Sequence, residues 1–335
     1  MSRTSHFICY FAPNLGVVCP FVGYIPLFQS DFSMNSIHIN QCPLCGCTHS
    51  SKAFTCIDHY ASGESFAVCV CDACRFMWTQ DFPAEAEIGA YYESADYISH
   101  TDTRRGVMNT LYHHVRNLML KRKAGLVERA SGKRTGRLLD IGTGTGYFPA
   151  TMQQRGWKVE AIEKSEQARA FAQTHFGLSV QPDEALMGAF AGERFDVITL
   201  WHVMEHLEPL NEVWQRLHQL LADDGVLVVA VPNSASFDAQ YYGSAWAAYD
   251  VPRHLWHFTR DTMAQWGMKH GFEPVGLHPM PFDAFYVSML TEKQLKHSAA
   301  FLRGMWTGLL AWFSALVKRE RSSSLIYVFR KKGKC

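Results

Sequence analysis

Glycine recurs at every second position in one stretch near the middle of this chain, 138–148, which reads LLDIGTGTGYF. The apolar residues before Asp140 predict a buried strand, the alternating glycines predict a turn, and the aromatic pair predicts a helix start. Glycine lets the backbone approach a ligand where a Cβ would collide, and a helix start offers unpaired N–H groups to an anion. A dinucleotide-binding turn would space its glycines as G-x-G-x-x-G. The stretch therefore predicts a ligand-binding strand, turn and helix of another kind.

A second acid follows at the spacing of the next strand. Residues 158–162 read as that strand, and Glu163 ends it, 23 positions after Asp140. A carboxylate there can accept hydrogen bonds from both ribose hydroxyls of a nucleoside, and such a charge-assisted bond contributes about 1.5–3 kcal/mol. The alternative is a solvated acid beside a helix capped by Ser165. Because the acid and the glycine turn occur together at α/β spacing, we favour the ribose role.

A third stretch, 195–207, reads FDVITLWHVMEHL and predicts a buried strand that ends at Trp201. The residues after it should lie at the carboxyl edge of the sheet, where open α/β folds bind ligands. His202 to His206 also matches the H-x-x-E-H pattern of some zinc peptidases. That chemistry needs a long helix, whereas this segment follows a strand and precedes Pro209, so we interpret the match as coincidental.

The D-x-G-x-G-x-G pattern at 140–146 and the stretch 195–207 closely resemble class I S-adenosylmethionine-dependent methyltransferases. The Glu-His pair at 205–206 is common in the small-molecule O-methyltransferases of that class. The resemblance implies an α/β fold, with a doubly wound, Rossmann-like seven-stranded sheet, and S-adenosyl-L-methionine as cofactor. It implies cofactor contacts from Asp140, Gly142, Thr143, Gly144, Gly146, Tyr147, Glu163, Lys164, Asp183, Leu200, Trp201 and His202.

Two of these assignments have alternatives. Asp183 is the candidate to meet the adenine amine, but Pro182-Asp183 could also be a plain turn. Ubiquinone-type O-methyltransferases carry acids after the fourth strand that can hold a divalent cation. This chain has His202 at the position of the first of those acids, which puts metal dependence in doubt.

An aromatic segment, 244–259, follows the fifth predicted strand and reads SAWAAYDVPRHLWHFT. It resembles the D-x-P-R-H-L-x-x-F segment of the zinc-bearing branch of the class, which is related to sugar C-methyltransferases, and we expect it to fold over cofactor and substrate. A base would accelerate methylation of a hydroxyl or an acidic carbon by about 10²–10⁴, and histidine suits neutral pH. We expect this base, in order of preference, to be His254, His206 or His202.

Each of these histidines could instead be structural. Asp250 or Glu205 could orient whichever one acts. Arg253 could hold an anionic substrate group or simply pair with Asp250.

Seven of the ten cysteines fall between Cys42 and Cys74. Two C-x-x-C pairs, with 25 residues between them, suit a tetrahedral zinc ion, and a hairpin over 54–70 would fill the gap. We therefore predict a structural zinc that contributes on the order of 10 kcal/mol to folding. Its predicted ligands are Cys42, Cys45, Cys71 and Cys74.

Disulfides or redox thiols are the alternative reading of these cysteines. The chain has no convincing secretory signal, so we expect a reducing, cytoplasmic location, where disulfides are rare. Cys47, Cys56 and Cys69 are spare, and Cys69 could replace Cys71 as a ligand.

The chain divides by composition into four parts. We expect a poorly ordered extension at 1–33, a small zinc ribbon at 34–80, a linker with an amphipathic helix at 81–132, and a methyltransferase domain at 133–335. The last part carries an apolar helical insertion near 285–319. Within it, 299–317 has Arg303 as its only charge, and predicts a helix that covers the pocket or lies on a membrane or partner surface. Core packing is the alternative.

Helix and strand signals alternate from residue 137 onward, as in a parallel sheet covered on both faces. Strands are expected near 137–141, 158–162, 178–181, 195–201, 225–231, 272–278 and 324–330. Helices are expected near 147–155, 165–176, 209–222 and 260–270.

The charge balance points away from nucleic acid. With 32 basic and 31 acidic residues the net charge is +1, so no global field draws the chain to RNA or to anionic lipid. We expect O- or C-methylation of a small-molecule acceptor, with a sugar, a glycan precursor or a lipid-linked molecule as candidates. Two alternatives stay open, a zinc-ribbon RNA methyltransferase and a non-catalytic zinc- and nucleoside-binding module.

Overall fold

The computed structural model describes residues 36–92, 107–280 and 282–333, with the side chains of 107–114 left aside. The predicted extension at 1–33 lies outside the described residues, as do residues 93–106 of the expected linker. The described residues belong to one compact unit.

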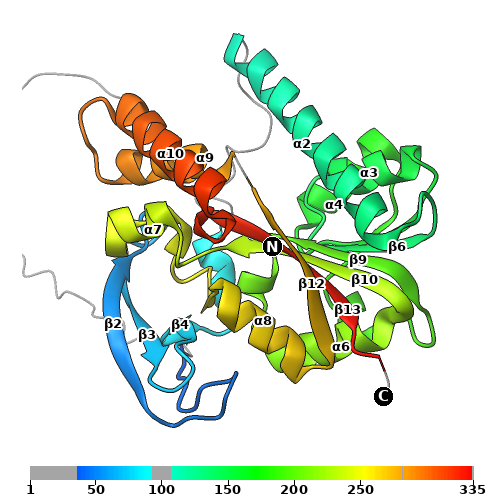
Figure 1. Ribbon diagram of the computed structural model, residues 1–335, viewed down its shortest axis with the longest axis horizontal. Coiled ribbons are helices and arrows are strands. Elements are labelled where there is room, and N and C mark those ends of the chain that lie inside the picture. The colour runs from blue at the N-terminus through cyan, green and yellow to red at the C-terminus, as the bar shows by residue number, and fades with distance from the viewer. Residues whose placement is uncertain (1–35, 93–106, 281, 334–335) are drawn as a thin grey trace, which may run out of the picture. The chain divides into compact units, whose positions relative to one another are not determined.

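The main sheet has seven strands in the order β12-β13-β10-β9-β6-β7-β8 (Figure 1). The five strands from β10 to β8 run parallel, and β13 is antiparallel to both β10 and β12. This arrangement confirms the predicted doubly wound, Rossmann-like α/β sheet. The strands are β6 (Arg137–Ile141), β7 (Lys158–Ile162), β8 (Val180–Gln181), β9 (Phe195–Trp201), β10 (Leu221–Pro232), β12 (Phe272–Pro279) and β13 (Ser324–Lys331).

Helices cover both faces of this sheet because the central strands are apolar on both sides. In β10, Leu227 and Val229 pack into one core with α6 and α8, whereas Val228 and Ala230 pack into another with α2 and α3. Alternate side chains of a strand point to opposite faces, so a continuous apolar run needs cover on both. These helices are α2 (Val107–Ser131), α3 (Tyr147–Gln154), α6 (Leu210–Leu220) and α8 (Arg260–Lys269), with α4 (Glu166–Phe176) beside α3.

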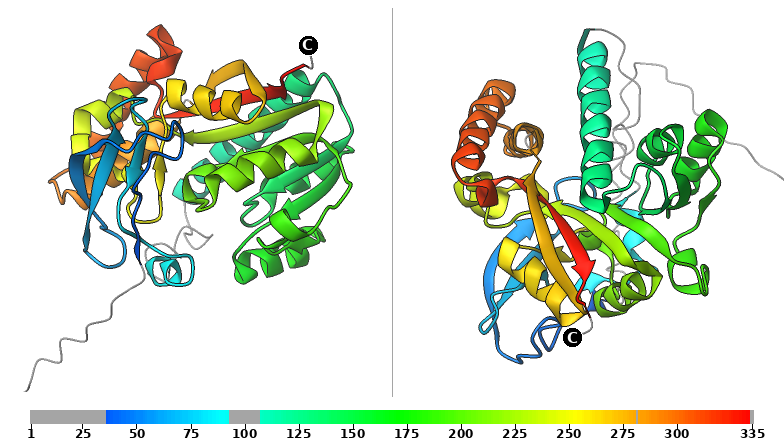
Figure 2. Two further views of the ribbon diagram at one scale, coloured as in Figure 1. Left: turned by 90° about the horizontal axis from the view of Figure 1, so that it is seen from below. Right: turned by 45° about the vertical axis from the view of Figure 1, so that its right-hand side comes forward.

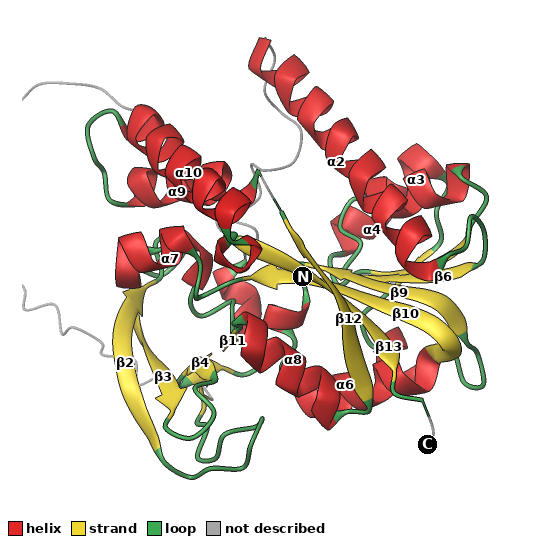
Figure 3. Cartoon of the chain, viewed as in Figure 1, coloured by secondary structure: helices red, strands yellow, loops and turns green. Residues whose placement is uncertain are grey.

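A second, antiparallel sheet is built mainly by the cysteine-rich segment (Figure 3). Its order is β11-β4-β3-β2, and the β2–β3 hairpin confirms the one predicted between the cysteine pairs. The outer strand β11 comes from the aromatic segment 244–259, far along the chain. The strands are β2 (Ser50–Ile57), β3 (Ser65–Cys71), β4 (Met77–Thr79) and β11 (Trp256–His257).

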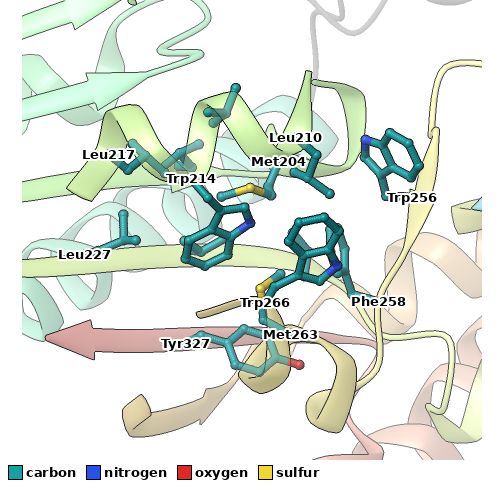
Figure 4. Close-up of a cluster of buried hydrophobic side chains, with 14 of the residues drawn as sticks. Met204, Leu210, Trp214, Leu217, Leu227, Trp256, Phe258, Met263, Trp266 and Tyr327 are labelled. Carbon is teal, nitrogen blue, oxygen red and sulfur yellow. The ribbon is translucent and has the colours of Figure 1, made fainter. Parts of the chain in front are cut away.

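The cysteine-rich segment also shares a hydrophobic core with the main sheet. Phe76 is fully buried, and its ring centroid lies 6.0 Å from that of Trp256, 5.7 Å from Phe258 and 5.6 Å from Trp266. Figure 4 shows these last three side chains in one cluster with Trp214 of α6. The zinc-ribbon segment therefore packs as part of the same body, although it is a separate stretch of sequence.

An α-helical hairpin, α9 (Asp283–Gln294) and α10 (Ala300–Val317), projects beside α7 (Phe237–Tyr242) (Figures 1 and 2). The predicted helix at 299–317 is confirmed, and α9 falls mostly within the predicted helical insertion near 285–319, whereas α7 was not predicted as a helix. A Cβ at Gly304 would lie 2.6 Å from the Met289 Cα, and one at Gly308 would lie 2.7 Å from the Phe285 Cα. Glycines therefore let the two helix backbones approach closely.

The remaining elements are short. They are β1 (Ser36–Ile37), β5 (Phe82–Pro83), α5 (Ala185–Gly188) and the 3₁₀ turns η1 (Ile88–Tyr91), η2 (Met204–His206), η3 (Gly243–Ala245), η4 (Ala247–Tyr249) and η5 (Arg319–Arg321).

Candidate active site

The three glycines between β6 and α3 have different structural roles. All adopt positive φ, but a Cβ at Gly142 would lie 2.3 Å from Val203, and one at Gly146 would lie 2.8 Å from Ala172. Gly144 has nothing within 4 Å of its would-be Cβ. Gly142 and Gly146 therefore allow packing, against the post-β9 segment and α4 respectively, while Gly144 faces open space where a ligand fits.

Asp140 holds the glycine turn in place through its side-chain carboxylate. It is buried and accepts hydrogen bonds from the hydroxyls of Thr199, at 2.5 Å, and Thr143, at 2.7 Å. Burial raises the pKa of Asp140 to about 6, although both hydroxyls oppose the rise. Its carboxylate fixes β6 to β9 and to the turn.

Glu163 lies directly at the open glycine. Its carboxylate accepts one hydrogen bond from the Gly144 N–H, at 2.7 Å, and another from the Ser165 N–H, at 2.9 Å. Ser165 also caps α4, as the alternative interpretation expected. Capping does not compete with a ligand role, because the acid stands beside the only glycine of the turn with free space. Lys164, by contrast, pairs with Glu85 on an exposed surface.

The residues at the end of β9 and directly after it, 200–202, differ in burial and in their neighbours. Leu200 is 0% exposed and packs in the main core, and its contact with the cofactor stays a prediction. Trp201 is half-buried, with the Lys123 Nζ 4.4 Å from its ring centroid. His202 has φ +59° and points between two acids, 3.4 Å from Glu205 and 3.2 Å from Asp283.

His202 is held as a cation. Burial disfavours its charged form, but the hydrogen bonds and charges of Asp283 and Glu205 outweigh burial and raise the pKa of His202 to about 9. At neutral pH this imidazole is already protonated and cannot accept a proton.

Glu205, His206 and His254 form a second cluster next to it. Glu205 is 0% exposed, and the ligand atoms of the three side chains all lie within 4.8 Å of one another. The Nδ1 of His206 lies 2.9 Å from the Arg253 carbonyl, and the Nδ1 of His254 lies 2.8 Å from the Ala248 carbonyl. A carbonyl can only accept, so each Nδ1 carries a proton and donates it to that carbonyl.

Burial and the neighbouring His254 lower the pKa of His206 to about 4, so this ring is neutral at pH 7. The cluster therefore gathers one carboxylate and two imidazoles. Such a group can take the proton of an acceptor hydroxyl or bind a cation. The H-x-x-E-H match stands in the short turn η2 rather than in a long helix.

Arg253 is part of the framework. It is buried and pairs with Asp58 at 2.9 Å and Asp250 at 2.6 Å, and it donates to the Tyr91 carbonyl at 2.9 Å. The predicted pairing with Asp250 is confirmed. Because the guanidinium is enclosed and occupied, the alternative role of holding an anionic substrate group is wrong.

Comparison with known proteins agrees with this geometry. Residues 112–277 match a family model described as a methyltransferase domain. The chain carries a class I S-adenosylmethionine-dependent methyltransferase domain. The matched residues include the parallel strands and the glycine turn after β6, and β13 completes the sheet beyond them.

Curated relatives of this methyltransferase cover it only in part. A ubiquinone biosynthesis O-methyltransferase of Caulobacter sp. (strain K31) is 35% identical over 104 residues, which is 29% of this chain and 41% of the relative. One from Cereibacter sphaeroides (strain ATCC 17029) is 30% identical over 160 residues, 44% of this chain and 64% of the relative. The chain thus spans less than two thirds of either relative.

Among solved structures, one similar chain is the Burkholderia thailandensis 1,6-didemethyltoxoflavin-N1-methyltransferase with bound 1,6-didemethyltoxoflavin and S-adenosylhomocysteine. It is 19% identical, with a TM-score of 0.46, and the match covers 83% of this chain and 100% of that one.

The predicted cysteine ligands of the methyltransferase come together. The sulfurs of Cys42 and Cys74 are 3.6 Å apart, those of Cys45 and Cys71 are 3.5 Å apart, and all four lie within 4.8 Å of one another. A tetrahedral zinc with Zn–S bonds of about 2.3 Å places its sulfurs about 3.8 Å apart. The donor set therefore fits zinc. Cys71 rather than Cys69 belongs to the cluster.

Sequence reasoning gave no site role to two charged residues. Burial lowers the pKa of Lys123, while the charges of Asp283 and Asp140 favour its protonated form. Asp283 starts α9 and pairs with His202. Asp283 follows the strand expected near 272–278, whereas Lys123 is one of several basic residues on a helix. Asp183 lies in a turn before α5, where its carbonyl accepts from Leu186, and its adenine contact stays a prediction.

Gly144→Ala is expected to weaken S-adenosylmethionine binding by at least about tenfold, because the new methyl group enters the open space beside Glu163. Gly192→Ala is the matched control, since Gly192 also has positive φ and nothing within 4 Å, but precedes β9 at the opposite edge of the sheet. Titration calorimetry measures affinity, and thermal melting reports the backbone strain common to both. Equal affinities in the two variants would contradict this assignment of Gly144.

His202→Asn should remove a pH-dependent contribution to stability. A folded-state pKa near 9, above the ordinary 6.5, means that the ion pairs of His202 stabilise fully below pH 6.5 and are lost as pH rises through 9. Asparagine tolerates the positive φ at this position. The Tm difference between wild type and variant should be largest at pH 6 and shrink above pH 9. A difference that does not change with pH would show that His202 is not held as a cation.

Proposed function

We propose that this chain transfers a methyl group from S-adenosylmethionine to a small-molecule acceptor, at a hydroxyl oxygen or an activated carbon. One observation carries the proposal: the open glycine, Gly144, and the carboxylate of Glu163 meet at 2.7 Å, in contact with the segment that bears the histidines. The link is the contact between Gly142 and Val203, the residue after His202.

The chain's own residues supply most of the chemistry. The cofactor, when bound, supplies a methyl group already activated on a sulfonium. Backbone N–H groups of the glycine turn would bind its carboxylate, and Glu163 would accept from its ribose hydroxyls in place of the Gly144 N–H. Holding the two reactants in line contributes about 7–11 kcal/mol to lowering the barrier.

His254 is the base that we favour. Its Nδ1 lies on the Ala248 carbonyl, so its Nε2, 3.9 Å from the Asp250 Oδ2, would be the atom that takes the acceptor's proton. The buried carboxylate of Glu205 lies in the same cluster and would stabilise the imidazolium that forms. His206 is the second choice. His202, already protonated at neutral pH, would serve as a fixed positive charge instead.

Of the two acceptor groups, a hydroxyl oxygen and an activated carbon, we favour the hydroxyl. The curated relatives are named for O-methylation in ubiquinone biosynthesis. The acceptor itself, whether a sugar, a glycan precursor or a lipid-linked molecule, is to be identified by experiment.

Methyl transfer can be followed with S-adenosylmethionine labelled at the methyl group and an extract of the native host lacking this gene. We expect label in the small-molecule or lipid fraction. His254→Asn, which keeps a donor to the Ala248 carbonyl, should bind the cofactor normally but slow transfer by about 10²–10⁴. His175→Asn, on the exposed surface of α4, is the control. Label that enters RNA instead, or a wild-type chain that does not bind the cofactor, would overturn the proposal.

We also propose that the four-cysteine cluster holds a structural zinc. The support is the S···S distances and the absence, in the described residues, of a second ligand type in that cluster. Because Phe76, two residues after Cys74, is buried in the shared core, zinc should stabilise the whole chain.

Cys71→Ser should abolish zinc binding, which is expected at about one ion per wild-type chain, and should lower the Tm of the whole chain in one transition. Cys69→Ser is the matched control, two residues away and outside the cluster. Elemental analysis of the purified proteins measures the metal. Loss of zinc in Cys69→Ser with retention in Cys71→Ser would refute this ligand set.

A further inference from the structure

The outward face of α10 is built from large apolar side chains. Leu302 is 67% exposed and Trp306 is 63% exposed, values that are unusual for such residues on a helix of a folded domain. They lie at helical spacing along one side of α10, and we call this set the outer face. It consists of Phe301, Leu302, Met305, Trp306, Phe313, Leu316 and Val317.

The inner face of α10 explains why these residues cannot turn inward. It is made of Gly304, Thr307, Gly308, Ala311 and Ala315, all buried. Gly304 and Gly308 pack against the α9 backbone so closely that a single Cβ would collide. Small residues inside and large apolar residues outside is the pattern of helices that pack together within lipid, the reverse of a water-exposed helix.

The charges around the outer face are basic. Arg303 is the only charge within α10, and its partner Glu292 is a buried residue of α9. Lys296 lies exposed before the helix, and Lys318 and Arg319 lie exposed after it. The nearby acid Glu320 pairs with Arg260 and lies 3.7 Å from the Lys318 Nζ. An apolar strip with cations at both ends is complementary to anionic lipid headgroups over acyl chains.

We propose that α10 docks this chain on the surface of an anionic lipid bilayer, with its outer face in the interface. In the described residues α10 is the one helix long and apolar enough to cross a membrane. Its 18 residues give about 27 Å, and both ends return to the same body. It packs along α9, and β13 re-enters the main sheet from Ser324. α10 therefore lies in the bilayer surface without crossing it.

The docking hairpin is also part of the candidate active site. Asp283, the first residue of α9, holds His202 at 3.2 Å. An acceptor anchored in the bilayer would therefore meet the site beside α9. This second step rests on the proposed function and narrows the acceptor to an amphiphile or lipid-linked molecule, whereas docking itself does not depend on catalysis.

Flotation with vesicles tests the docking. Wild type should bind vesicles of phosphatidylcholine and phosphatidylglycerol in equal parts, and bind less to phosphatidylcholine alone. The double variant Leu302→Glu/Trp306→Glu should bind at least about tenfold more weakly. Met268→Glu, 57% exposed on α8, is the matched control and should bind like wild type. Lys318→Glu/Arg319→Glu should lose only the preference for phosphatidylglycerol.

Circular dichroism and S-adenosylmethionine binding on the same samples show whether each variant is folded. Equal vesicle binding by wild type and the outer-face variant would overturn the proposal. So would a wild-type chain that ignores vesicles and forms a dimer that the outer-face variant dissociates. Vesicle binding without cofactor binding would contradict the proposed function but not the docking. Cofactor binding without vesicle binding would contradict the docking alone.

Discussion

The buried guanidinium of Arg253 joins the parts of the molecule that must meet for a site to exist. The guanidinium pairs with Asp58 from the cysteine-rich segment and with Asp250 from its own segment. The backbone carbonyl of Arg253 accepts a hydrogen bond from His206. Removing one partner of a buried ion pair typically costs about 3–5 kcal/mol, because the remaining charge is left without compensation. The position of His254, the next residue, therefore depends on contacts from both sheets.

The carboxyl edge of the main sheet, next to His254, is rich in buried charge. Asp140, Lys123, Asp283 and His202 influence one another's protonation in turn. Burial makes each charge costly alone, so each depends on a neighbour of opposite sign. The result is two histidines of one short segment in different states. His202 is protonated between two acids, whereas His206, beside another imidazole, is neutral. Only a neutral ring can act as a base.

Local sequence was enough wherever one segment carries its own signal. The strands Arg137–Ile141, Lys158–Ile162 and Phe195–Trp201 have the predicted bounds, because each is an apolar run closed by glycine or a polar residue. The helical insertion near 285–319 was expected, but the separate bounds of α9 were not, because Phe282, its N-cap, offers no capping side chain. Leu200 lies in the core because successive side chains of a strand point to opposite faces.

The sequence by itself determined the glycine turn, the acid that follows the next strand, the four clustered cysteines and the apolar composition of 299–317, since each is a short pattern with its own chemistry. Only the tertiary structure decided what these patterns meet. Strand β11 pairs with β4 across most of the chain, and Phe76 enters the core of the main sheet. Such pairings depend on the shape and burial of distant segments, and no local window of residues encodes them. For the same reason the sequence left Arg253 open between holding an anionic group and pairing with Asp250, whereas the structure encloses it between Asp58 and Asp250.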